Sequence, residues 1–141
     1  MPPPTQPRFY ADESVLGLGK GLAALRRDVV HPGHPGVPQL QLGMRDVDWI
    51  AAAAALGLVA ISRDRRMRTR PAERQAMLDH GLRCVWIGGK HDQSTWDWAV
   101  LLARHWDRLE TIVTDLGGGP WFLVLTSNGL RQIDVRRAKP R

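Results

Sequence analysis

The chain has 141 residues, of which 43% are hydrophobic, and its formal net charge is +6. This length and composition predict a single domain with its own core and exclude a chain that is disordered throughout. With one cysteine no disulfide can form within the chain, and no apolar run reaches the roughly 20 residues that cross a bilayer. We therefore expect a soluble, cytoplasmic protein without membrane contact, whose positive charge favours a polyanionic partner such as nucleic acid.

The first part of the chain alternates between strand and helix signals. Residues 1–7 hold four prolines and predict a flexible arm, whereas residues 8–12 predict a short buried strand. Apolar side chains at spacings of three and four predict a helix over residues 15–25 with Ser14 as its N-cap, although three glycines in its first half oppose it. Residues 29–30 predict a second strand.

A loop rich in proline and glycine, residues 31–43, separates this part from the rest of the chain. Beyond it, Gly57 and Gly81 are helix stop signals, Pro71 is a helix start, and Asn128-Gly129 is a hairpin turn. These signals delimit, in order, a helix over 46–56, a strand over 58–62, a helix over 71–80, a strand over 82–87, a helix over 93–116 and a hairpin of 121–126 with 130–135.

This order of elements predicts an α/β fold. We expect a three-layer α/β/α sandwich with a mainly parallel central sheet and a C-terminal β-hairpin, because right-handed crossovers place helices on both faces of the sheet. No repeat and no internal boundary interrupts the pattern. The predicted domain spans residues 8–135, between the arm of residues 1–7 and a basic tail of residues 136–141.

Three aspartates stand where such a fold can gather them. Asp12 closes the first strand, Asp48 lies in the first turn of the second helix, and Asp64 follows the third strand. Residues just past the carboxyl ends of parallel strands meet where the strand order reverses. Clustered carboxylates repel one another unless a cation holds them, and oxygen-only ligands suit Mg²⁺ or Mn²⁺. The sequence thus predicts a metal site that orients water for phosphodiester hydrolysis.

Other acids near these positions allow two interpretations each. Glu13 is either a further metal ligand or a first-turn helix acid, and Asp46 is either a ligand or a helix N-cap. Glu73 is a supporting acid or an ion-pair partner of a neighbouring arginine. The positive end of the helix dipole stabilises an acid at a helix start without any catalytic role, and this alternative applies to Asp48 as well.

Arginines surround Asp64 in the sequence. A guanidinium binds phosphate through two parallel hydrogen bonds, so this cluster predicts contacts to an RNA backbone, with a solvated surface as the alternative. The predicted RNA-binding residues are Arg63, Arg65, Arg66, Arg68 and Arg70.

Three short segments carry a resemblance to a known family. They are Arg8-Phe9-Tyr10-Ala11-Asp12-Glu13, Asp46-Val47-Asp48-Trp49-Ile50 and Val59-Ala60-Ile61-Ser62-Arg63-Asp64. With these motifs the chain resembles the PIN-like nuclease superfamily and, more narrowly, the compact PIN-like proteins related to VapC-type toxins of toxin–antitoxin pairs. The resemblance spans roughly residues 8–135.

The resemblance implies a Mg²⁺- or Mn²⁺-dependent endoribonuclease that acts as a homodimeric toxin and is masked by a cognate antitoxin. Asp12, Asp48 and Asp64 match the first three acids of the family. Two departures stand out: the second acid is often glutamate in the family, and residues 87–90 offer no match to its fourth acid. Glu13 or Glu73 could take that place.

Two alternatives remain beside this hypothesis. A PIN-like scaffold that binds nucleic acid or a protein partner without turnover would fit the missing fourth acid. A receiver-like domain phosphorylated on Asp64 would share the acidic pocket, but its usual Ser/Thr and Lys after later strands have no clear match here.

Overall fold

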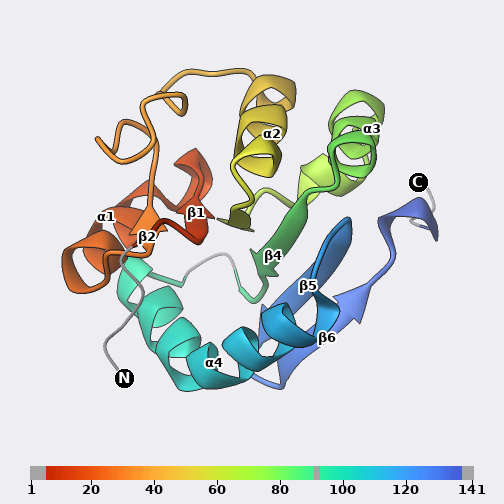
Figure 1. The fold of residues 1–141 in the computed structure, drawn as a ribbon. Coiled ribbons are helices and arrows are strands. Elements are labelled where there is room, and N and C mark those ends of the chain that lie inside the picture. The colour runs from red at the N-terminus through yellow and green to blue at the C-terminus, as the bar shows by residue number, and fades with distance from the viewer. Residues whose placement is uncertain (1–5, 91–92, 138–141) are drawn as a thin grey trace.

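A computed structural model describes residues 6–90 and 93–137 of the chain, and Figure 1 shows its layers. The strands are β1 (Phe9–Ala11), β2 (Val29–Val30), β3 (Val59–Ser62), β4 (Arg83–Ile87), β5 (Trp121–Thr126) and β6 (Gly129–Ile133). They form one sheet in the order β2-β1-β3-β4-β5-β6. Strands β1 to β5 are parallel and β6 pairs antiparallel with β5, which confirms the mainly parallel sheet with a terminal hairpin.

The helices cover both faces of this sheet. They are α1 (Leu16–Leu25), α2 (Asp46–Ala55), α3 (Pro71–His80) and α4 (Thr95–Leu116). Helices α2 and α3 lie on one face and α1 and α4 on the other, so the three-layer architecture is confirmed (Figure 1). Within the described ranges, no helix combines the length and the apolar character needed to cross a membrane.

Helix boundaries follow local chemistry and differ from the predicted ones by a few residues. Pro71 opens α3, and Gly81 ends it in the left-handed region with φ of 71°. Helix α4 begins at residue 95 because Ser94 and Asp97 form a capping box ahead of it. The predicted cap Ser14 instead lies within a 3₁₀ turn, and the Asp12 carboxylate caps that turn.

The glycines that weakened the predicted first helix have a packing role. A Cβ on Gly19 would lie 2.7 Å from the Cβ of Ala11 and 3.1 Å from that of His31. Only glycine therefore lets α1 approach β1 this closely, and the helix forms despite its poor intrinsic propensity because the sheet supports it.

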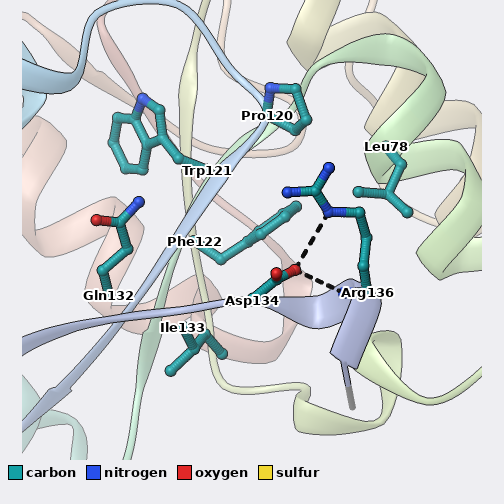
Figure 2. Close-up of a pocket in the computed structure, with 8 residues that line it drawn as sticks. All are labelled: Leu78, Pro120, Trp121, Phe122, Gln132, Ile133, Asp134 and Arg136. Carbon is teal, nitrogen blue, oxygen red and sulfur yellow. Dashed lines mark hydrogen bonds and ion pairs between the residues drawn. The ribbon is translucent and has the colours of Figure 1, made fainter.

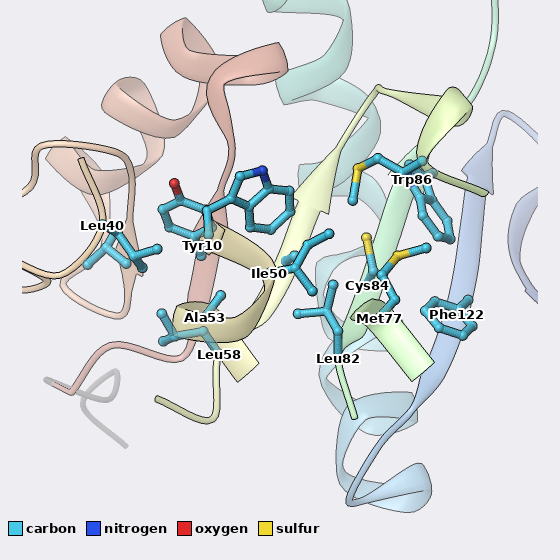
Figure 3. Packing of buried hydrophobic residues seen from close by; sticks show 14 of the residues in the cluster. Tyr10, Leu40, Ile50, Ala53, Leu58, Met77, Leu82, Cys84, Trp86 and Phe122 are labelled. Carbon is cyan, nitrogen blue, oxygen red and sulfur yellow. The ribbon is translucent and has the colours of Figure 1, made fainter. Parts of the chain in front are cut away.

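Two apolar clusters fill the spaces between the layers. The cluster under α2 and α3 includes Tyr10, Ile50, Met77 and Trp86, with the Trp86 ring stacked on another core aromatic (Figure 3). A second cluster lies under α1 and α4. The sheet is thus buried on both faces, which leaves its edges and strand ends as the places for polar chemistry. Residues 1–5 of the predicted arm and 138–141 of the predicted tail lie outside the described residues, and residues 136 and 137 belong to a short 3₁₀ turn after β6.

Candidate active site

The strand order reverses at the carboxyl ends of β1 and β3. From β1 the chain passes first to β2 on one side and later to β3 on the other. Asp12 directly follows β1, and its backbone N–H donates to the carbonyl of Ile61 in β3 at 3.1 Å. Asp64 lies two residues beyond the end of β3. The topology therefore places these two carboxylates at a common edge, where open α/β sheets bind ligands.

A pocket of about 160 Å³ opens at this edge. Its four acidic residues come from separate parts of the chain: the segment after β1, the start of α2 and the turn after β3. The lining residues are Tyr10, Asp12, Glu13, Ser14, Gln41, Met44, Asp46, Trp49 and Asp64. The structure thus gathers four carboxylates in one small space.

Asp12 is the most deeply placed of these acids, with only 4% of its surface exposed. The pKa of Asp12 is raised from 3.8 to about 6, mainly by burial and to a smaller extent by the nearby Asp64, against the hydrogen bonds from Ser14 and Ser62 that lower it. Its Oδ1 accepts from the backbone N–H of Ser14 at 3.0 Å and from the Ser14 hydroxyl. Ionised Asp12 is therefore costly in this fold unless a cation compensates it.

Ser62 extends this network to the second acid. The Ser14 and Ser62 hydroxyl oxygens lie 3.2 Å apart, and Ser62 Oγ accepts from the Asp64 backbone N–H at 3.0 Å. Ser62 is fully buried at the end of an apolar strand. Sequence analysis did not identify Ser62 as part of the site. The only signal was a polar residue at the end of an apolar strand, directly before Arg63 and Asp64.

Asp46, rather than Asp48, is the α2 residue that reaches the pocket. Residues 46 and 48 are about 200° apart around a helix, so only one of them can face the sheet edge. Asp46 Oδ1 accepts from the indole N–H of Trp49 at 3.0 Å, on the buried side of α2. Asp48 is 49% exposed, pairs with Arg45 Nε at 3.0 Å and does not line the pocket.

Of the three aspartates that the sequence predicts to lie together, only Asp12 and Asp64 line the pocket. The missed signal was helical periodicity: Asp46 precedes the buried Trp49 by three residues and the buried Ile50 by four, so it shares their face.

Two supporting acids occupy different positions. Glu13 lines the pocket, and its Oε1 accepts from the backbone N–H of Gly43, which ties the long loop before α2 to the site. Glu73, in the first turn of α3, lies 3.8 Å from Arg70 Nη1 and does not line the pocket. Of the two, only Glu13 is placed to contact something bound among the aspartates.

The five arginines divide into three groups. Arg63 lies 4.6 Å above the Trp98 ring and donates to the carbonyls of Ile87 and Gly88 at 3.3 and 3.2 Å. Arg68 is half-buried and lies 5.0 Å above the Trp86 ring. Burial lowers the pKa of both guanidinium groups. These two side chains are thus engaged in holding loops against the core.

Arg65 and Arg66 are the exposed members of the cluster. They line a groove of about 440 Å³ together with Ser14, Arg63 and Asp64. Ser14 and Asp64 belong to the acidic pocket as well, so the two hollows adjoin. Arg70 forms the third group, because its guanidinium, although partly exposed, contacts Asp46 and Asp64.

A separate cavity of about 330 Å³ lies beside the start of β5 and the end of β6 (Figure 2). It is at the amino ends of the parallel strands and shares no residue with the acidic pocket. Its polar groups include Asp134, whose Oδ1 accepts from Arg136 Nε at 3.3 Å. One carboxylate already paired with arginine does not resemble a metal centre, so the acidic pocket is the candidate active site.

The donor chemistry of the acidic pocket fits a hard divalent cation, because every acid offers oxygen ligands. Within residues 6–90 and 93–137, however, no three His, Cys, Asp or Glu side chains are arranged so that they could hold an ion. The right ligands are gathered, but in this arrangement they do not enclose a metal.

An α/β sandwich with carboxylates gathered at its topological switch point defines an open-sheet protein whose ligand site lies outside the carboxyl ends of its strands. The model of the PIN-like domain family matches residues 7–89, from before β1 to beyond β4. This match covers more than half of the chain, and the protein therefore belongs to the PIN-like domain family. No curated protein and no solved structure gives a significant match.

Proposed function

We propose that this protein is a divalent-metal-dependent endoribonuclease that hydrolyses RNA phosphodiesters. PIN-like domains are often nucleases, and the chain belongs to that family. The observation that carries the proposal is the adjacency of an acidic pocket and an arginine groove, which share Ser14 and Asp64. A phosphodiester needs both environments at once, because its backbone is anionic and its hydrolysis requires an activated water.

In this proposal Asp12, Asp46 and Asp64 hold Mg²⁺ or Mn²⁺, and Asp46 takes the role that the sequence pattern assigned to Asp48. When bound, such an ion activates water and stabilises charge on the phosphate oxygens. Arg65 and Arg66 bind the flanking phosphates from the adjoining groove. The Ser14 hydroxyl donates to Asp12 and fixes the orientation of its carboxylate.

We further propose that the nuclease is the toxin of a type II toxin–antitoxin module. This part rests on the resemblance of its motifs to compact VapC-type proteins, and it includes a cognate antitoxin that covers the acidic pocket, a homodimer and a cytoplasmic location. A small neighbouring gene whose product binds this protein and stops its cleavage of RNA would support it. Toxicity unaffected by any co-expressed neighbour would count against it.

The matched pair Asp46→Asn and Asp48→Asn tests the site. Removing an outer-sphere partner of a metal typically costs 10- to 100-fold, so loss of a direct ligand should cost at least about a hundredfold in metal-dependent RNA cleavage. We expect this loss for Asp46→Asn and for Asp12→Asn, and cleavage within about threefold of wild type for the exposed Asp48→Asn. The rates are measured on a labelled RNA with Mn²⁺ and with EDTA. Equal losses for both α2 variants would refute the placement of the site.

A second function is favoured by the absence, within the described residues, of an assembled three-ligand group. A PIN-like scaffold would bind RNA through its arginine groove without turning it over. This function predicts salt-dependent RNA binding and no cleavage at any metal concentration. Metal-stimulated cleavage that Asp12→Asn abolishes would exclude it.

A further inference from the structure

One guanidinium holds three carboxylates beside the acidic pocket. Arg70 Nη1 lies 3.3 Å from Asp46 Oδ2, 3.4 Å from Asp64 Oδ2 and 3.8 Å from Glu73 Oε1. These acids come from α2, the segment after β3 and α3, and all four side chains are partly buried. Arg70 is thus the residue that connects the acids of three separate elements.

The backbone delivers Arg70 to this position from two sides. Its N–H donates to the carbonyl of Arg66 at 2.9 Å, and its own carbonyl accepts from Arg74 at 2.9 Å, so it is anchored between a 3₁₀ turn and α3. The guanidinium lies at the end of a long side chain with several rotatable bonds. It can therefore leave the acids without any movement of the fold.

The oxygens that Arg70 contacts belong to two of the proposed metal ligands. Asp46 and Asp64 are the carboxylates that the proposed function assigns to a divalent metal, yet in this structure their Oδ2 atoms face Arg70. A guanidinium and a divalent ion repel each other at contact distance, so both cannot occupy these oxygens. This explains why the acids are gathered without being arranged around an ion.

We propose that Arg70 is a built-in counter-cation, which holds Asp46 and Asp64 in the metal-free protein and must release them before a divalent ion binds. Arg70 thereby positions the two ligands and sets the metal affinity of the pocket. The inference rests on the proposed function insofar as that function places the metal among these acids. It reassigns Arg70 from RNA contact, its role in the sequence pattern, to control of the acidic pocket.

Titration of the metal-free protein with Mn²⁺ by calorimetry tests this role. Of the ion pairs lost in Arg70→Gln, two are partly exposed pairs to the proposed metal ligands, and we expect the affinity of this variant for Mn²⁺ to be roughly two- to thirty-fold tighter than that of wild type. Arg74→Gln is the matched control: it removes the same charge from the next turn of α3 but no contact to Asp46 or Asp64, and its affinity should stay within about twofold. Arg70→Lys keeps the charge and should fall between wild type and Arg70→Gln.

Thermal unfolding supplies a second readout that a purely structural role would not move in the same way. In EDTA, Arg70→Gln should unfold at a lower temperature than wild type, because its acids lack their counter-cation. Saturating Mn²⁺ should narrow or reverse this difference in unfolding temperature, since the stabilisation by a ligand increases with the logarithm of its affinity. If Arg70→Gln does not fold, Arg70→Lys carries the test.

The outcomes separate this inference from the proposed function. Wild-type protein that cleaves RNA with Mn²⁺, together with a folded Arg70→Gln that binds Mn²⁺ equally or more weakly, would overturn the inference alone. Failure of both wild type and Arg70→Gln to bind Mn²⁺ would overturn both, whereas Mn²⁺ binding without RNA cleavage would overturn the proposed function alone. Tighter binding by Arg70→Gln but not by Arg74→Gln would establish the counter-cation.

Discussion

Asp12→Asn should stabilise the metal-free protein at neutral pH. The fold raises the pKa of Asp12 from 3.8 to about 6, mainly because burial penalises its charged form. Above pH 6 the ionised carboxylate therefore costs about 3 kcal/mol relative to the unfolded chain. Asparagine has the same shape, and its Oδ1 can still accept from the Ser14 backbone. We expect a gain of up to about 3 kcal/mol, or roughly 10 °C in Tm for a domain of this size.

The pH dependence of this gain follows from the direction of the pKa shift. Between about pH 4 and pH 6, Asp12 is ionised in the unfolded chain but still protonated in the folded one. The folded protein then binds more protons, so the contribution of Asp12 to stability decreases as pH rises through this window. Asparagine does not titrate. The difference in unfolding free energy between Asp12→Asn and wild type should be near zero below about pH 4 and reach its plateau above about pH 6.

Urea denaturation in EDTA, from pH 4 to pH 8, measures this difference directly. Subtracting the wild-type curve removes the contributions of all other titrating groups. Asp48→Asn serves as the control: its carboxylate is exposed and paired only at the surface, so its effect should stay within about 0.5 kcal/mol. An Asp12→Asn protein that is less stable than wild type at pH 8, or whose difference does not vary with pH, would refute the reasoning.

The structure also separates the roles of neighbouring groups. Arg66→Gln should weaken RNA binding and reduce the slope of log affinity against log salt concentration by about one, with little change in stability. Arg68→Gln should instead lower the free energy of unfolding by about 1 kcal/mol, because its contact with Trp86 is lost. Binding titrations at several salt concentrations and urea denaturation measure the two effects, and the reverse pattern would contradict the division of the cluster. Gly19→Ala should destabilise the fold by about 1–3 kcal/mol in urea denaturation, because its Cβ would collide with Ala11. An unchanged midpoint would show that α1 can move away from β1 without cost.

Local sequence patterns were sufficient to predict the architecture and part of the candidate site. Strand and helix signals alternate clearly along the chain. Residues such as Pro71 and Gly81 set the helix boundaries, because their backbone preferences act within one turn. The positions of Asp12 and Asp64 were also accessible, since residues that follow parallel strands share one edge by geometry alone. These features depend on interactions between neighbours in the chain and on general rules of sheet topology.

Tertiary structure decided the rest of the site. The choice between Asp46 and Asp48, which lie about 200° apart around the helix, depends on which side of α2 faces the sheet. The role of Arg70 depends on Asp46, an acid from α2 that only the fold brings within reach of its side chain, whereas Arg66 pairs with the nearby Asp64. Five similar arginines between positions 63 and 70 carry no such information, because a flexible charged side chain takes its role from the partners that the fold brings to it.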